Sequence, residues 1–263
     1  MQDTAKVEGL LAAARRLSDR CDEAIPALIG AGDVAYATNP LDYAWPLHEA
    51  WIRTWGGHGA RTLLLGMNPG PWGMAQSGVP FGATGVVRDD LRLPDIAMST
   101  PSGAHPQRPI EGLSLERQEV SGQRLWGLLL DLWGGPEAAM QQVFLVNHCP
   151  LLLLNERGAN VTPDKLPVSV IGPLLEACDD HLAEVVDLLG IERVVGVGAY
   201  ALKRARLALG GGRNDVGRSP NGREVHLSTC WHPSPASPLA NKNGGADWRA
   251  NVTSVLRTAS QMN

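Results

Sequence analysis

Four short apolar runs, separated by longer segments of helical periodicity, are the feature that most limits how this chain can fold. The runs cover residues 61–66, 142–147, 192–198 and 224–230, and each ends close to a Gly, Asn or Pro. An apolar run without polar alternation predicts a strand that is buried on both faces, as in a parallel sheet. We therefore expect four interior, parallel strands.

Segments of helical periodicity surround these runs. They cover residues 4–28, 122–132, 170–189, 200–209 and 246–260. This alternation predicts the α/β fold class, in a three-layer α/β/α arrangement around a central, mainly parallel, four-stranded sheet. The 263 residues and 44% hydrophobic composition suffice for a packed core, so we expect a single domain over residues 1–263. Within it, residues 1–40 are expected to form an N-terminal helical extension.

Hydropathy and cysteine spacing exclude several classes of protein. No apolar run is long enough to span a bilayer, and residues 1–10 lack the charged-then-apolar order of a signal peptide, so we expect a cytoplasmic protein without a membrane partner. Cys21, Cys149, Cys178 and Cys230 stand far apart without a C-x-x-C pair, which argues against zinc and iron–sulfur sites. We expect four buried free thiols and no metal.

The overall charge lacks the usual signature of a nucleic-acid-binding protein. The formal net charge is −4 and the pI is near 6.0, whereas such domains are typically basic. One stretch could still supply a local positive field for a few phosphates, or could simply be a solvated helix and loop. Its cations are Lys203, Arg204, Arg206, Arg213, Arg218 and Arg223.

Two segments rich in Gly and Pro follow apolar runs that are far apart in the sequence. Gly66-Met67-Asn68-Pro69-Gly70-Pro71-Trp72-Gly73-Met74 follows the first run, and Trp231-His232-Pro233-Ser234-Pro235 follows the last. Ligands of open α/β sheets bind at the carboxyl ends of the strands, so these loops are expected to face one crevice. Two long connections, residues 71–121 and 151–166, are also expected to be functional.

Asn68 and His232 are the candidate catalytic residues. A rigidly held amide such as that of Asn68 can orient water but is not a strong base or nucleophile, which suits glycosidic cleavage through an oxocarbenium-like transition state. The alternative for Asn68 is an Asx-turn before Pro69. His232 follows a strand and could stabilise charge on a leaving group, or could only fill a polar niche.

Asn147 and Phe81 are candidates for binding a base. Asn147 ends the second predicted strand, and its amide offers both a donor and an acceptor, which suits the edge of a pyrimidine. The ring of Phe81 could stack on a flat base or could be a core ring under a loop. His148 is the one other histidine to consider, because it adjoins Asn147 at a strand end.

Several segments together resemble the single-strand-selective monofunctional uracil-DNA glycosylases. They are residues 66–82, Glu119-Val120-Ser121-Gly122 and residues 147–151, 194–198 and 232–242. The resemblance implies the fold of the uracil-DNA glycosylase superfamily and action in base excision repair without metal or cofactor. It implies a single- or double-stranded DNA partner, from which uracil and 5-substituted uracils such as 5-hydroxymethyluracil are removed. We expect a monomer.

The resemblance also assigns roles to residues. Asn68 matches the residue that positions the hydrolytic water, and His232 matches the one that stabilises the departing uracil anion. Four residues match the substrate-binding set: Met67 lining the pocket, Gly70 leaving room beside the 5-position of uracil, Phe81 stacking on the base and Asn147 reading its edge. No lysine is placed as a Schiff-base nucleophile in these motifs, so strand cleavage is not expected.

The segment after His232 matches the wedge that enters the duplex while the target nucleotide swings out. It comprises Pro233, Ser234, Pro235, Ala236 and Ser237. The family usually carries Arg-Asn after the second proline of this segment, so the small residues here predict weaker action on duplex than on single-stranded DNA. Two other functions stay open: a glycosylase for deaminated purines (hypoxanthine or xanthine), and a non-catalytic binder of damaged or single-stranded DNA.

Overall fold

The central sheet contains the four predicted strands and one more at its edge. The computed structural model describes residues 2–212 and 214–260. The strands lie in the order β3 (Val143–Asn147), β2 (Thr62–Gly66), β5 (Arg193–Val197), β7 (Glu224–Cys230) and β6 (Val216–Arg218). The first four are mutually parallel, which confirms that prediction, and β6 pairs antiparallel with β7. The expected four-stranded sheet therefore has five strands, because the three residues of β6 are too few to produce an apolar run.

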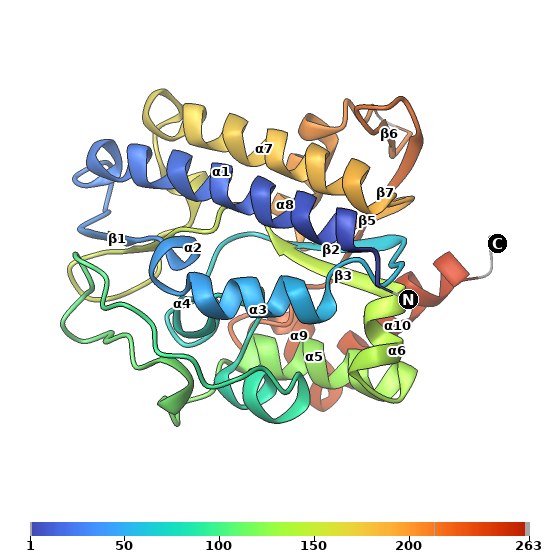
Figure 1. Ribbon diagram of the computed structural model, residues 1–263, viewed down its shortest axis with the longest axis horizontal. Helices are drawn as coiled ribbons and strands as arrows, with labels where there is room; N and C mark the ends of the chain where they lie inside the picture. Colours follow the sequence, from blue (N-terminus) through green and yellow to red (C-terminus); the bar gives the residue numbers. More distant parts are fainter. Residues whose placement is uncertain (1, 213, 261–263) are drawn as a thin grey trace.

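Helices cover both faces of this sheet. Figure 1 shows α1 (Thr4–Leu28) and α7 (Val168–Leu189) above it, and α5 (Val120–Trp133) and α10 (Ala246–Ser260) below it. The predicted three-layer arrangement is confirmed. The other helices are α2 (Pro40–Tyr43), α3 (Trp45–Trp55), α4 (Met74–Ser77), α6 (Pro136–Gln142), α8 (Ala199–Ala208) and α9 (Pro238–Asn241), with shorter helical turns at Val86–Asp90, Gly112–Ser114, Pro163–Lys165 and Lys242–Gly245.

The N-terminal helix is part of the packed core. The side chain of Asp3 caps α1 by accepting hydrogen bonds from the backbone N–H groups of Ala5 and Lys6. Along the helix, Leu10 lies in the main hydrophobic cluster, and Leu17 lies in a second cluster that also holds buried residues of α7. The helix α1 therefore packs into the same hydrophobic core as the rest of the domain.

The two long connections contain structure that the sequence pattern did not reveal. In the second connection, β4 (Leu152–Leu154) pairs antiparallel with β1 (Tyr36–Thr38), so a small second sheet joins the N-terminal region to the segment after β3. The first connection carries α4 and two of the helical turns. Both connections run from carboxyl ends of central strands, where they build the walls of a cavity described below.

The predicted cationic stretch is largely neutralised. Four of its arginines pair with carboxylates: Arg204 with Asp179, Arg206 with Asp215, Arg218 with Glu224 and Arg223 with Asp187. Arg213 lies outside the described residues. The pairing removes most of the positive field that this stretch could offer to a phosphate.

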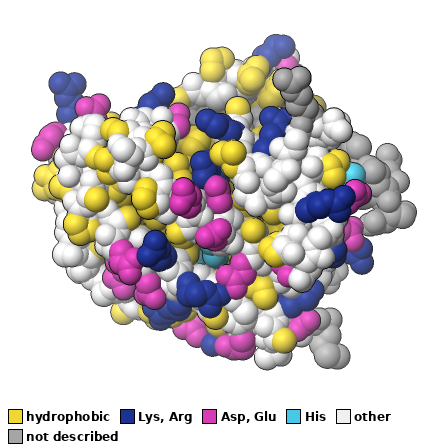
Figure 2. Space-filling view, turned by 90° about the horizontal axis from the view of Figure 1, so that it is seen from above, with side chains coloured by type: hydrophobic (Ala, Val, Ile, Leu, Met, Phe, Trp, Pro, Cys, Tyr) yellow, Lys and Arg dark blue, Asp and Glu magenta, His cyan; other side chains and the backbone are white. Residues whose placement is uncertain are grey.

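The remaining surface and core features are ordinary for a globular domain. Acidic and basic side chains are interspersed on the face seen from above in Figure 2. One such pair joins α1 to α7, between Arg16 and Glu184 at 2.5 Å. All four cysteines are buried and free, as expected. Among the described residues, no helix is both long enough and apolar enough to cross a bilayer.

Candidate active site

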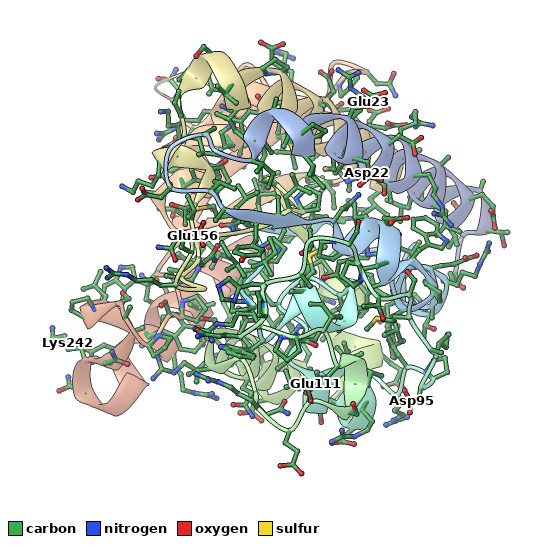
Figure 3. The ribbon with its side chains drawn as sticks, turned by 90° about the vertical axis from the view of Figure 1, so that its left-hand side faces the viewer. Asp22, Glu23, Asp95, Glu111, Glu156 and Lys242 are labelled. Carbon is green, nitrogen blue, oxygen red and sulfur yellow. The ribbon has the colours of Figure 1, made fainter. Side chains whose placement is uncertain are left out.

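The two predicted loops meet at one cavity of about 370 Å³. It lies at the carboxyl ends of the central strands; Figure 3 faces this end, with the turn carrying Glu156, the segment carrying Lys242 and the connection carrying Glu111 around it. Its walls are Met67, Asn68, Pro69, Gly70, Met74, Phe81, Glu119, Ser121, Asn147, Asn160, Thr162, His232 and Ser234. All six predicted catalytic and substrate-binding residues therefore share one cavity. A larger hollow of about 610 Å³, beside Thr62 and Val143 at the amino ends of the strands, contains none of them.

Strand register brings Asn147 beside the first loop. Asn147 of β3 pairs directly with Gly66 of β2, and its side-chain Nδ2 lies 3.2 Å from the sulfur of Met74. A Cβ atom at Gly66 would overlap Oδ1 of Asn147 and would lie 2.8 Å from two ring atoms of Phe81. The glycine is therefore required for the amide and the aromatic ring to approach the strand end together.

The ring of Phe81 forms part of both the core and the cavity wall. It is only 7% exposed and belongs to the main hydrophobic cluster. Its φ of 55° is uncommon for a bulky residue, and such strained conformations gather at functional sites. The two interpretations of Phe81 are thus compatible, because a ring fixed by core packing is a rigid platform for stacking.

A second asparagine holds the amide of Asn68. Nδ2 of Asn68 donates to Oδ1 of Asn160 at 3.2 Å and to the carbonyl of Pro69 at 3.3 Å, while Nδ2 of Asn160 donates to the same carbonyl at 3.1 Å. In residues 2–212 and 214–260, no backbone N–H donates to Oδ1 of Asn68, so the Asx-turn alternative is not what the structure shows. The amide oxygen stays available to accept a hydrogen bond from water.

The imidazole of His232 is held as a neutral donor. The backbone N–H of Ser234 donates to Nδ1 of His232 at 3.1 Å, so the proton of the neutral ring is on Nε2. Burial lowers the pKa of His232, which keeps the ring neutral at physiological pH. The backbone of Trp231 is fixed from α10, through its N–H to Asn251 at 2.9 Å and its carbonyl to Trp248 at 2.8 Å. A positioned, neutral N–H donor results.

His148, by contrast, has a structural environment. Its ring is fully buried and its Nε2 lies 2.8 Å from Asp179, which also pairs with Arg204. Its Nδ1 lies 3.3 Å from the hydroxyl of Tyr200. Because His148 does not line the cavity, we assign it to the packing behind the strand end rather than to the site.

The predicted wedge is a turn supported from α5. Arg124 donates to the carbonyl of Pro233 at 3.0 Å and to Oδ1 of Asn241 at 2.9 Å, and Asn241 donates to the carbonyl of Pro235 at 2.7 Å. Ser234 lines the cavity, and Ala236 is exposed at the tip of the turn. Hydrogen bonds therefore fix the base of the turn, and its tip carries only a small, exposed side chain.

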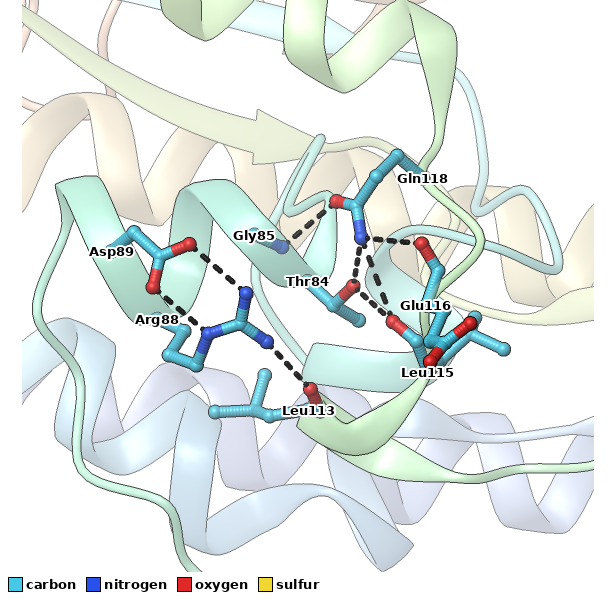
Figure 4. Close-up of polar contacts among 8 residues, drawn as sticks. All are labelled: Thr84, Gly85, Arg88, Asp89, Leu113, Leu115, Glu116 and Gln118. Carbon is cyan, nitrogen blue, oxygen red and sulfur yellow. Dashed lines mark hydrogen bonds and ion pairs between the residues drawn. The ribbon is translucent and has the colours of Figure 1, made fainter.

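The cavity also contains four polar residues to which the sequence pattern assigns no role: Glu119, Ser121, Asn160 and Thr162. Asn160 lies in the connection 151–166, which was expected to be functional but offered no local pattern to single out one residue. Glu119 follows Gln118, whose amide is anchored to Thr84 and Gly85 (Figure 4). Burial raises the pKa of Glu119 to about 7, so its carboxyl is partly protonated near neutral pH.

Comparisons with known proteins find similar sequences over most of the chain. Residues 54–252 match the model of the uracil DNA glycosylase superfamily. The chain is 44% identical over 236 residues to the single-strand selective monofunctional uracil DNA glycosylase of Bos taurus, an alignment covering 89% of this chain and 81% of the relative. It is 46% identical over 204 residues to that of Rattus norvegicus, covering 78% and 70%.

A solved structure shares the fold at low sequence identity. The crystal structure of wild-type SMUG2 from Pedobacter heparinus matches with a TM-score of 0.53 and 16% identity, covering 86% of this chain and 88% of the other. That likeness supports the α/β architecture alone, whereas the residues matched by the family model, 54–252, include the loops that line the cavity. The chain belongs to the single-strand selective monofunctional uracil DNA glycosylase family, within the uracil DNA glycosylase superfamily.

Proposed function

We propose that the cavity removes uracil and 5-substituted uracils, such as 5-hydroxymethyluracil, from DNA by hydrolysing the N-glycosidic bond in base excision repair. The observation that carries the proposal is the convergence of an oriented amide, Asn68, and a neutral imidazole donor, His232, on one cavity. The names of the mammalian relatives support uracil as the base and single strands as the preferred substrate.

The base-binding walls suit an extruded pyrimidine. The target nucleotide swings out of its strand, at a cost of a few kcal/mol that is least for single-stranded DNA. In the cavity the base stacks on Phe81 and presents its polar edge to the amide of Asn147, beside Met67. Gly70, which resembles the family glycine beside the 5-position of uracil, lines this cavity, and Oε1 of Glu119 lies 2.7 Å from where a Cβ atom of residue 70 would be, so we expect a 5-hydroxymethyl group to face Gly70 and Glu119.

Bond cleavage uses the two candidate catalytic residues in turn. The bond between C1′ and the base nitrogen breaks first, leaving an oxocarbenium-like sugar and a uracil anion. The Nε2–H of His232 stabilises the negative charge that develops on the base. Water that donates to Oδ1 of Asn68 then adds to C1′, and the products are free uracil, protonated from solvent, and an abasic site.

The small side chain at the tip of the wedge predicts that a larger, cationic one would increase activity on duplex DNA. Ala236→Arg is expected to raise activity on double-stranded DNA on the order of tenfold, equivalent to about 1.4 kcal/mol, because a long cationic side chain can fill the vacated stack and reach a phosphate. The measurement is kcat/KM on matched single- and double-stranded substrates. Ala236→Met, which adds length without charge, is the control. An equal change on both substrates, or no change, would show that the wedge does not set strand preference.

The hydrogen bond between the two asparagines predicts coupled effects. Asn160→Ala is expected to lower kcat roughly tenfold with little effect on KM, because the amide of Asn68 loses its partner. A double-mutant cycle with Asn68→Ala supplies the control: in the Asn68→Ala background, the same change should cost almost nothing. Additive losses would mean that Asn160 acts on something other than Asn68.

The proposed function is tested by a panel of bases. Single- and double-stranded oligonucleotides carrying one uracil, hypoxanthine or xanthine are incubated with the protein and with Asn68→Ala, and abasic sites are detected by alkaline cleavage. Release of uracil that Asn68→Ala loses is the expected result. Release of the purines alone would establish the deaminated-purine activity instead, and binding without any release would identify a non-catalytic DNA-binding protein.

A further inference from the structure

Two arginines without ion-pair partners lie against the ring of Trp72, in the loop of residues 66–74 that also carries Asn68. The guanidinium carbon of Arg117 lies 4.2 Å from the ring centre of Trp72, and that of Arg108 lies 5.2 Å from it. Most arginines of this acidic protein pair with carboxylates, but within the described part of the chain neither of these two does. We call Trp72, Arg108 and Arg117 the Trp72 platform.

The three residues of the platform do not line the cavity themselves, but each is close, along the chain or through a hydrogen bond, to a residue that does. Trp72 lies two residues after Gly70, and Arg117 lies two residues before Glu119. Arg108 donates to the carbonyl of Gly158, which lies two residues before Asn160. Gly70, Glu119 and Asn160 all line the cavity. The wedge, by contrast, reaches the cavity through His232 and Ser234. The platform and the wedge are thus next to different parts of the cavity wall.

The platform is held in place before any ligand binds. Nε of Arg108 donates to the carbonyl of Gly158 at 3.0 Å, and its Nη1 donates to that of Gln107 at 2.8 Å. On either side of Arg117, the side chain of Gln118 bonds to Thr84 and to the carbonyl of Glu116 at 2.8 and 3.0 Å (Figure 4). Arg117 itself is exposed, and no bond from its guanidinium to another described residue competes with a ligand.

The chemistry of the platform suits one class of ligand. Two guanidinium groups whose bonds are only to an aromatic ring and to neutral carbonyls keep their charge available for a phosphate. A half-buried indole beside them offers apolar area to an unpaired base or sugar. Basic groups combined with an aromatic surface are typical of sites for single-stranded nucleic acid, in which the bases are free to stack.

The geometry points to the Trp72 platform as a second DNA subsite, which binds the phosphate and base of a nucleotide that flanks the extruded one in single-stranded DNA. This inference rests on the proposed function for its substrate and extends the contact beyond the base pocket. It gives a chain with a small-residue wedge a separate means of holding a flexible single strand. A duplex, whose bases are paired and stacked, can offer the platform only its phosphates.

The test compares Arg117→Gln with the wild type in binding and in catalysis. Fluorescence anisotropy with a uracil-free thymidine oligonucleotide, over a range of salt concentrations, reports binding without requiring any base release. We expect Arg117→Gln to weaken binding roughly tenfold and to reduce the slope of log K against log salt by about 0.7, the loss of one single-strand phosphate contact. On a uracil-containing single strand, KM should rise while kcat stays unchanged.

Matched variants separate the platform from general charge effects. Arg61→Gln removes an exposed arginine at the amino ends of the strands, away from the cavity, where it pairs with Glu192, and should leave both measurements unchanged. Arg117→Lys should keep the salt slope and lose part of the affinity, because a lysine retains the charge but not the planar stacking group. Equal melting temperatures for all variants show that folding is unaffected.

The outcomes distinguish this inference from the proposed function. Unchanged slope and KM in Arg117→Gln, with normal uracil release, would overturn the subsite and leave the proposed function standing. Arg117-dependent binding of single strands without uracil release would support the subsite and refute the proposed function. An equal loss of affinity for duplex and single-stranded DNA would also overturn it, since the platform would then be a phosphate contact for any DNA.

Discussion

Replacing His232 by Ala should lower the rate of uracil release on the order of 10²-fold or more. The reason is the neutral Nε2–H donor, fixed by the hydrogen bond from the Ser234 backbone to Nδ1, which meets the charge as it develops on the departing base. Single-turnover kinetics on a uracil-containing single strand measures this step directly. Binding of the strand should change little, because the interaction strengthens only in the transition state.

The control for this prediction is another histidine of the same sheet. His226 lies near the amino end of β7 and lines the hollow at that end of the sheet, away from the cavity, so His226→Ala should retain the wild-type rate. Should His232→Ala release uracil as fast as the wild type, charge on the leaving base must be stabilised by other groups, and His232 would have no part in the mechanism.

Asn68→Ala should cause a loss of similar size, on the order of 10²-fold or more, for a different reason. Its amide oxygen accepts from no backbone N–H in the described part of the chain, while its nitrogen donates to Asn160 and to the carbonyl of Pro69, so the side chain is oriented to place a water. Without it, water still reaches the sugar but is no longer positioned. The rate of abasic-site formation under saturating enzyme measures the effect.

Asn221→Ala provides the matched control for the amide. Asn221 lies in an exposed turn before β7, and among the described residues its side chain bonds to Asp187 alone, so its removal should not affect base release. A wild-type rate in Asn68→Ala would contradict the proposed role and would leave the asparagine as a structural part of the loop.

The sequence predicts those strands and helices whose hydrophobic pattern extends over enough residues to be recognised. The four parallel strands are continuous apolar runs, and the helices around them are long enough for their periodicity to be unambiguous. The strands β1, β4 and β6 have three residues each, so their pairing depends on tertiary contacts rather than on a local pattern. Only the folded chain reveals that β1 and β4 meet.

The candidate site was predictable where residues follow strands directly. Asn68, Asn147 and His232 all come at or just after strand ends, and strand register then brings the first two together. Asn160 was missed because it reaches the cavity from an irregular connection, where spacing carries no information.

The sequence also could not predict which arginines lack an ion-pair partner in the folded protein. In the basic stretch between Lys203 and Arg223, most arginines form ion pairs, such as Arg206 with Asp215. The arginines that stay unpaired at the cavity rim, Arg108 and Arg117, belong to one long connection and are brought to Trp72 by its path. Which charges are compensated is a property of the packed surface and not of composition.

The most direct test of the central claim is the detection of free uracil itself. Purified protein and Asn68→Ala are each incubated with a single-stranded oligonucleotide carrying one uracil, in low salt with a chelator, and the released base and the remaining strand are identified by mass spectrometry. The account predicts free uracil and an intact strand with one abasic site, both lost with Asn68→Ala. An unchanged oligonucleotide, or equal release by the variant, would contradict it.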